Sequence, residues 1–83
     1  MNRPSLERLV PLCQLPPGAE AKVRELKGEA GFRQRARELG FGEDATVKKI
    51  GGAGPFVCLV NGARIALGHS VAMQIIVARQ LMA

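Results

Sequence analysis

The stretch FVCLVNGARIAL, residues 56 to 67, contains two short apolar runs joined by Asn61 and Gly62. A type I′ turn needs a positive φ at both central residues, and Asn-Gly adopts this conformation readily. The stretch therefore predicts a β-hairpin with strands over 56–60 and 63–67. The first strand is apolar on both faces, as in a strand that is buried on both sides or packed against a partner. The residues predicted to share one face of the second strand are Ala63, Ile65 and Leu67.

The segments on either side of this hairpin also predict short strands. ATVKKI, residues 45–50, is rich in β-branched residues and ends at GGAGP, residues 51–55, which we expect to form a flexible hairpin tip. GGAGP lacks the GK[ST] and the following helix that a phosphate-binding loop requires. GHSVAM, residues 68–73, is too short for a regular helix and predicts a turn or a single helical turn. QIIVARQL, residues 74–81, predicts a final strand.

The first half of the chain contains one strand pattern and one helix pattern. AEAKVRELK, residues 19–27, alternates polar and apolar residues, which indicates a half-buried strand. The residue types alone would also permit a helix, but the preceding PPG and the following Gly28 favour a strand. In GFRQRAREL, residues 31–39, the apolar residues recur with the period of a helix, and Gly40 stands at the expected C-terminal cap. The apolar residues of that helical stripe are Phe32, Ala36 and Leu39.

These elements together predict a mainly β fold. SLERLV, residues 5–10, adds a short N-terminal helical turn with Ser5 as its cap. Two or more short strands with one apolar face each are not stable as an open hairpin, and closing the strands into a barrel removes the exposed edges. We therefore expect a small five-stranded barrel with one inserted α-helix. Residues 1–83 would form one domain, with residues 1–11 as an N-terminal extension.

Length, composition and charge restrict the class of protein. The chain has 83 residues, of which 47% are hydrophobic, so general disorder is excluded. It has three Phe and no Trp or Tyr, which argues against an aromatic platform for single-stranded nucleic acid. The N-terminal sequence has no continuous apolar run, and no run reaches the roughly 18 residues of a membrane span. We expect a cytoplasmic protein with reduced cysteines and no membrane insertion.

Residues for catalysis or for tight metal binding are scarce. The one histidine, His69, is next to Ser70, which is poor geometry for a nucleophile and its base, so we do not expect an enzyme. Cys13, Cys58 and His69 are widely separated, whereas structural zinc sites normally use four closely spaced ligands. Cys58 is most simply a small buried hydrophobe, and His69 an exposed turn residue. The alternative is weak binding of a divalent metal, Fe²⁺ or Zn²⁺, with no cofactor required.

The net charge of +5 at pH 7 points to an acidic partner without choosing its class. On a helix, Arg33 and Arg37 share a face, and Arg35 flanks the apolar stripe on the other side. The helix dipole favours cations near a helix C-terminus, so the presence of these arginines is explained without any ligand. Because no aromatic residues are interleaved with them, a solvated face or a protein-docking face is favoured over a nucleic-acid site.

Three segments, in this order, resemble the FeoA family. LCQLPPGAEAKV looks like the family's opening into its first barrel strand, and GFRQRARELGFGEDATVKKI is similar to its arginine-bearing helix, turn and strand. ARIALGHSVAMQIIV resembles its ending, and the likeness covers residues 12–78. Two positions depart from the pattern: Asp44 stands about where a glycine is usual, and Gly68 where a basic residue is common.

The resemblance implies an SH3-like barrel in the cytoplasm that assists ferrous iron uptake and is not itself an enzyme. The implied partner is FeoB, a membrane permease with a cytosolic GTPase domain. A related barrel also occurs in some iron-dependent repressors, so the fold alone does not decide function. Alternatives are a nucleic-acid-binding small barrel and a metal-responsive protein in which His69 binds Fe²⁺ or Zn²⁺ together with a carboxylate or with a cysteine, Cys58 or Cys13. The docking residues that we expect are Arg33, Arg35, Arg37, Phe41, Val71 and Met73.

Overall fold

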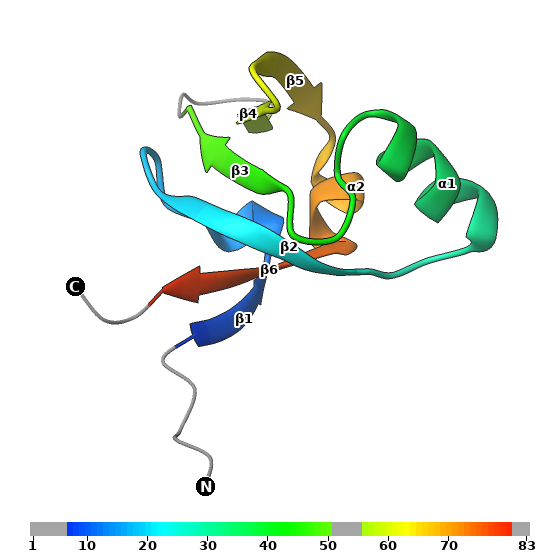
Figure 1. The fold of residues 1–83 in the computed structure, drawn as a ribbon, viewed down its shortest axis with the longest axis horizontal. Helices are drawn as coiled ribbons and strands as arrows, with labels where there is room; N and C mark the ends of the chain where they lie inside the picture. Colours follow the sequence, from blue (N-terminus) through cyan, green and yellow to red (C-terminus); the bar gives the residue numbers. More distant parts are fainter. Residues whose placement is uncertain (1–6, 51–55, 81–83) are drawn as a thin grey trace, which may run out of the picture.

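The computed structural model describes residues 7–50 and 56–80. These residues form an antiparallel sheet with two short α-helices and one 3₁₀ turn (Figure 1). The elements, in chain order, are β1 (Glu7–Pro11), η1 (Leu12–Gln14), β2 (Glu20–Leu26), α1 (Ala30–Glu38), β3 (Thr46–Lys49), β4 (Phe56–Val60), β5 (Ala63–Leu67), α2 (His69–Met73) and β6 (Ile75–Gln80).

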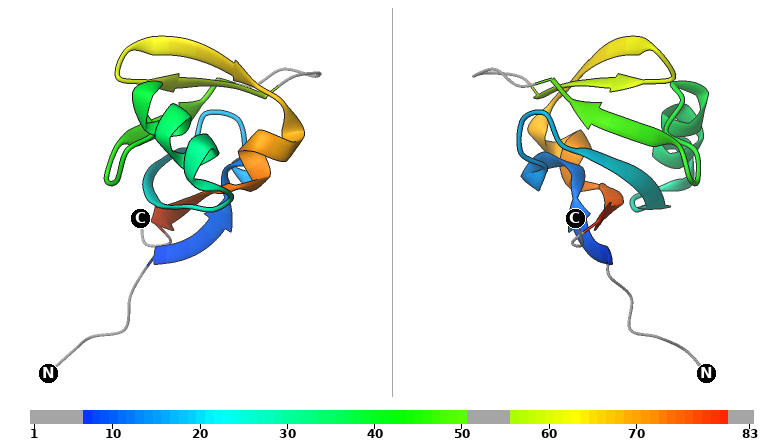
Figure 2. Two further views of the ribbon diagram at one scale, coloured as in Figure 1. Left: turned by 90° about the vertical axis from the view of Figure 1, so that its right-hand side faces the viewer. Right: turned by 60° about the vertical axis from the view of Figure 1, so that its left-hand side comes forward.

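The strands of the described part of the chain lie in the order β1-β6-β2-β3-β4-β5, and every neighbouring pair is antiparallel. The sheet curls so that the β4–β5 hairpin lies across from β6 and β1, with α1 and α2 on one side (Figure 2). The strands β1 and β5 stand at the two ends of this order. The fold is therefore mainly β, as the sequence predicts, but the described strands form a curled sheet with two edges rather than a closed ladder.

The predicted β4–β5 hairpin is confirmed. Asn61 has φ +52 and Gly62 has φ +79, as a type I′ turn requires. Cys58 and Val60 of β4 are fully buried, while Val57 and Leu59 on the other face are half-buried, so the second face of β4 is only partly covered. On β5, Leu67 is buried and Ile65 half-buried on the predicted face, but Ala63 at the start of that face is exposed. The predicted tip GGAGP lies outside the described residues.

The helix α1 begins and ends close to the predicted residues. Gly40 has φ +109 and donates its N–H to the carbonyl of Arg37, at 3.0 Å. Phe41 donates its N–H to the carbonyl of Ala36, also at 3.0 Å. These two bonds form a Schellman motif, in which glycine adopts the left-handed conformation without steric cost. A Cβ at Gly40 would also lie 2.9 Å from the Asn61 side-chain nitrogen, so the helix end packs closely on the β4–β5 turn.

The N-terminal helical turn predicted over residues 5–10 is wrong, and so is the count of five strands. Residues Glu7–Pro11 form β1, which pairs with β6 from Glu7 opposite Gln80 to Pro11 opposite Ile76. A single helical turn has a costly nucleus, whereas an extended segment next to an open strand gains a ladder of hydrogen bonds. Pro11 ends this edge strand, where a missing N–H is tolerated. The predicted capping residue Ser5 lies outside the described residues.

The core is aliphatic apart from one aromatic ring, as the composition predicts. It fills the inside of the curled sheet beneath the two helices. The largest fully buried side chains are Phe41, Leu12, Leu15, Ile75, Val23, Val47, Val60, Val77 and Cys58. No side-chain nitrogen or oxygen atom of the described residues is buried without a hydrogen bond. Functional groups therefore lie on the surface and in its hollows.

Candidate functional surface

The three arginines of α1 point to two different sides of the helix. Arg33 and Arg37 line a polar hollow between α1 and β2, whereas Arg35 lines an apolar groove between α1 and α2. Helical spacing explains the division. Arg33 and Arg37 are four residues apart and share a face, whereas Arg35 is two residues from each and faces the other way. The predicted docking set is therefore split between two surfaces.

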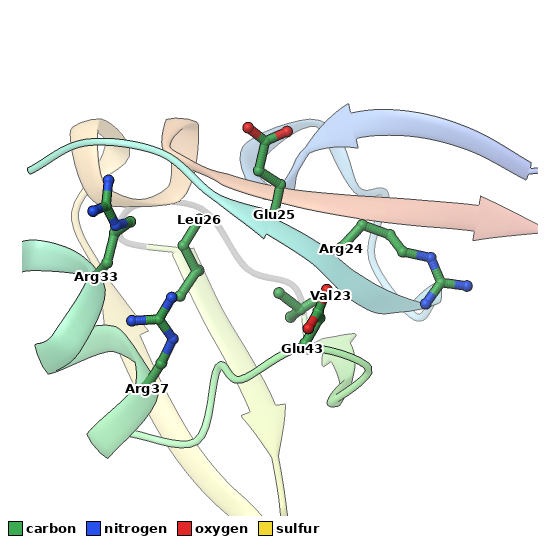
Figure 3. A pocket seen from close by; sticks show the side chains of 7 residues that line it. All are labelled: Val23, Arg24, Glu25, Leu26, Arg33, Arg37 and Glu43. Carbon is green, nitrogen blue, oxygen red and sulfur yellow. The ribbon is translucent and has the colours of Figure 1, made fainter. Parts of the chain in front are cut away.

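The polar hollow has a volume of about 330 Å³ (Figure 3). Its lining residues are Val23, Arg24, Glu25 and Leu26 of β2, Arg33 and Arg37 of α1, and Glu43 of the loop after α1. Arg37 is exposed, and no ion pair or hydrogen bond of its side chain is found within the described residues. Val23 and Leu26 give the hollow an apolar floor between the charged groups.

A β-bulge determines which residues of β2 face this hollow. The register of β2 against β6 shifts between Val23 and Glu25. Without that shift, strict alternation would place Glu25 on the same face as Val23. With it, Leu26 is half-buried on the α1 side, and Glu25, which also lines the hollow, directs its carboxylate away from α1 (Figure 3). The bulge thus replaces a carboxylate by an apolar side chain beside Arg33 and Arg37.

Arg33 has a structural contact within the chain. Its Nη1 donates a hydrogen bond to the carbonyl oxygen of Gly28, at 2.8 Å, and so ties α1 to the turn before it. Gly28 has φ +96, and a Cβ there would lie 2.3 Å from Oε1 of Gln74. The next contact along the turn is from the N–H of Lys27 to the carbonyl of Gln74, at 2.8 Å. Of the two arginines, Arg37 is thus the one more available to a partner.

The loop from Gly42 to Ala45 is fixed to β2. Asp44 donates its N–H to the carbonyl of Val23 at 2.8 Å, and its carboxylate pairs with Arg24. Asp44 has φ +66, a conformation that glycine adopts most easily and that aspartate tolerates better than most residues. Asp44 therefore adopts the left-handed turn conformation and adds an ion pair that glycine could not make.

The apolar groove has a volume of about 220 Å³. Its floor is formed by the core residues Ala36, Phe41, Leu67 and Ile75. Its sides are formed by Phe32, Leu39 and Val71, and its rim by Arg35, Ala66 and Gly68. Arg35 is the one charged residue among the described residues that line it.

The structure corrects the expected role of Phe41 and separates Met73 from the groove. Phe41 is fully buried, so it forms the groove floor and presents no surface to a partner. Its burial follows from its position directly after Gly40, where the Schellman motif brings an apolar residue onto the helix end. Val71 is half-buried at the side of the groove. Met73 is 50% exposed, but it is not part of the groove lining.

The three predicted metal ligands lie on different elements. His69 is exposed at the start of α2, Cys13 is half-buried in η1, and Cys58 is buried in the middle of β4. Burial raises the pKa of the Cys58 thiol to about 11, which disfavours the thiolate that binds metals. Within residues 7–50 and 56–80, no three His, Cys, Asp or Glu side chains are grouped so that they could bind a metal ion.

The two helices of the described residues are short, and neither is long and apolar enough to span a bilayer.

The sequence and the fold both match known proteins. The model of the FeoA domain family matches residues 10–79, which is most of the chain. The chain belongs to the FeoA family. This family is associated with ferrous iron transport and consists of small accessory domains rather than enzymes. The family predicted from the sequence is confirmed, and so is the SH3-like fold.

Solved FeoA structures agree with this membership. An iron uptake regulatory protein (FeoA) is 30% identical with a TM-score of 0.78, over 84% of this chain and 95% of that one. FeoA of Stenotrophomonas maltophilia, solved with zinc, is 27% identical with a TM-score of 0.67, over 86% and 96%. That protein is described as a prokaryotic SH3 domain protein and a candidate activating factor of ferrous iron transport. No curated protein matches this chain.

Longer metal-dependent regulators share the fold alone. A manganese-dependent transcriptional repressor is 18% identical with a TM-score of 0.77, over 92% of this chain but 44% of its own length. At that identity the likeness says nothing about binding or regulation, and FeoA fits best.

Sequence reasoning missed several residues of this FeoA surface. The groove rim at Ala66 and Gly68 comes from the approach of β5 and α2 to α1, which no local pattern indicates. Leu39 was predicted to lie in the buried stripe of α1, but it is 48% exposed at the side of the groove. Leu39 lies at the C-terminal end of α1, beyond the part of the apolar face that packs on the core, and this position explains its exposure.

Proposed function

We propose that this FeoA-family protein is a non-enzymatic accessory factor of ferrous iron uptake, which binds the cytosolic part of an FeoB permease and modulates it. The observation on which the proposal depends is the family match over residues 10–79. The solved iron uptake regulatory protein (FeoA), which matches this chain over 95% of its own length, supports the proposal, because its description assigns it a role in regulating iron uptake. The cytoplasm is the compartment in which such a domain meets the cytosolic part of the permease.

The helix α1 is the surface that we propose for docking. It presents Arg35 beside an apolar groove and Arg37 beside a polar hollow, and both side chains are exposed. Arginine is enriched in protein interfaces, where a planar cation and an apolar stem contribute together. Arg33 contributes less, because its guanidinium already binds the Gly28 carbonyl.

Binding to the purified cytosolic domain of FeoB tests this proposal. The double variant Arg35→Glu/Arg37→Glu reverses two exposed charges and should weaken binding by about tenfold. Each lost ion pair contributes under about 1 kcal/mol, and the loss of two is comparable to the 1.4 kcal/mol that corresponds to a tenfold change in affinity. Lys22→Glu/Lys48→Glu is the matched control, because both lysines are exposed, on β2 and β3, and the double substitution lowers the net charge by the same amount as the double arginine variant.

Uptake of radioactive ferrous iron by cells that lack the gene gives the second readout. Wild type and Lys22→Glu/Lys48→Glu should restore uptake, and Arg35→Glu/Arg37→Glu should restore less. If the wild type neither binds the domain nor changes uptake, the proposed function is wrong.

A second candidate function is metal-responsive binding, which the zinc complex of the Stenotrophomonas FeoA favours. On this chain His69 is the exposed residue that could bind Zn²⁺ or Fe²⁺. Calorimetric titration with each metal, on wild type and on His69→Ala, tests it. Heat that His69→Ala abolishes would support a metal site at α2. Equal heats for both proteins would remove His69 from consideration.

A further inference from the structure

We propose that the apolar groove between α1 and α2 binds a linear segment of the partner in which an apolar anchor side chain lies next to a carboxylate. The identity of that partner as the permease rests on the proposed function. The assignment of the groove as a binding site, and of the chemistry that it selects, does not rest on the proposed function.

The size of the groove favours a side chain over a small molecule. Pockets for cofactors and drug-sized ligands have volumes of about 300–1,000 Å³. At about 220 Å³, the groove is smaller than that range and suits one or two side chains of a peptide. A peptide in such a groove places one anchor in the hollow and runs along the rim.

The floor of the groove is apolar and already formed. Phe41 and Ile75 are 0% and 1% exposed, and Ala36 and Leu67 are nearly as buried, so the core packing fixes the floor. Leu39 adds exposed apolar surface at the side, with 48% of its area accessible. An apolar anchor would cover this surface and remove it from water, which is the main favourable contribution to such binding.

Arg35 determines the second feature of the bound segment. It is exposed at the rim, and within the described residues no hydrogen bond or ion pair of its side chain is found. The carboxylate one turn later, Glu38, accepts a hydrogen bond from Gln34 instead, at 3.4 Å. A guanidinium has five N–H donors in a planar fork that matches a carboxylate. With a net charge of +5, the chain also favours an acidic segment over a basic one.

The experiment titrates wild-type protein with three capped hexapeptides. Binding is measured from the shifts of the protein's backbone amide signals in NMR spectra. The peptides are Gly-Ser-Leu-Glu-Ser-Gly, the same peptide with lysine in place of glutamate, and the same peptide with serine in place of leucine. The Leu-Glu peptide should shift the signals of Arg35, Ala66 and Gly68. The Leu-Lys peptide should bind about two- to fivefold more weakly, the size expected for one exposed ion pair. The Ser-Glu peptide should give no saturable shifts in the groove.

Three variants make the result specific. Arg35→Glu should reverse the preference, so that the Leu-Lys peptide binds better than the Leu-Glu peptide. Arg37→Glu is the matched control on the same helix, and it should keep the wild-type preference because Arg37 faces the polar hollow. Ala66→Leu should weaken binding of both leucine peptides, since it adds volume at an exposed position of the rim.

The outcomes separate this inference from the proposed function. Shifts that map elsewhere, or equal affinity of Arg35→Glu for the two leucine peptides, would overturn the groove assignment even if wild type binds the permease domain. Conversely, the predicted peptide shifts without any binding of the permease domain would support the groove and overturn the proposed function.

Discussion

Arg35 and Arg37 lie two residues apart on α1 and face opposite surfaces, Arg35 the apolar groove and Arg37 the polar hollow. Helical geometry thus provides two exposed arginines with different surroundings. Substituting one tests its own surface while the other serves as a control. The third arginine of the helix, Arg33, belongs with the polar hollow but also has a contact within the chain.

Arg33→Ala should destabilise the fold more than Arg37→Ala. Arg33 is half-buried and donates a hydrogen bond to Gly28, and losing such a bond costs about 1 kcal/mol. For a domain of this size that corresponds to a fall in Tm of about 4–8 °C. Arg37→Ala should change the free energy of unfolding by less than about 0.5 kcal/mol. Urea and thermal denaturation measure both, and equal stability of the two variants would contradict the role given to Arg33.

Substituting alanine for each of two glycines near the start of α1 should change the free energy of unfolding in opposite directions. Gly28→Ala should destabilise by about 1–2 kcal/mol, because φ is +96 and the new Cβ meets the Gln74 side chain. Gly31→Ala should stabilise by about 0.5 kcal/mol, because Gly31 lies within α1 and a Cβ there meets no atom within 4 Å. Denaturation in urea measures both, and a neutral Gly28→Ala variant would show that this turn is not conformationally fixed.

At Asp44 the backbone conformation and the ion pair can be separated. Asp44→Ala loses the pairing with Arg24 and keeps an unfavourable φ of +66, so it should destabilise by about 1–1.5 kcal/mol. Asp44→Gly also loses the ion pair but relieves the backbone, so its free energy of unfolding should lie within about 0.5 kcal/mol of wild type. If the glycine variant is as unstable as the alanine variant, the ion pair rather than the backbone dominates at this position.

The two cysteines should differ in reactivity and in their effect at high pH. Cys58 is buried and its thiol pKa is raised from 9.0 to about 11, whereas Cys13 is half-buried. Iodoacetamide should therefore label Cys13 well before Cys58 in the native protein, as read by mass spectrometry. A raised thiol pKa contributes stability that is complete below pH 9 and is lost as pH rises from about 9 to 11. The Cys58→Ala variant should show a smaller loss over that range, and an identical loss would exclude Cys58 as its source.

Features set by neighbouring residues were predictable from the sequence. The Asn61–Gly62 turn, the cap at Gly40 and the alternation around Ala21 and Val23 each depend on a few adjacent residues, and all three are confirmed. The division of the arginines also follows from helical spacing alone. Phe41 could have been assigned to the core, since an apolar residue directly after a capping glycine commonly packs on the helix end.

Features that depend on distant segments were not predictable. The strand β1 exists because β6 offers an edge for pairing, and nothing in SLERLV indicates that edge. The bulge between Val23 and Glu25, which turns Leu26 toward α1, likewise depends on the register against β6. The apolar groove requires β5 and α2 to approach α1, so its rim at Ala66 and Gly68 becomes visible only in the folded chain.

The most direct test of the account is calorimetric titration of the purified cytosolic domain of FeoB with wild type, Arg35→Glu and Arg37→Glu. We expect wild type to form a complex, Arg35→Glu to weaken it several-fold, and Arg37→Glu to weaken it less. Lack of any complex with wild-type protein would contradict docking on the permease, and equal affinity for all three proteins would contradict docking through α1.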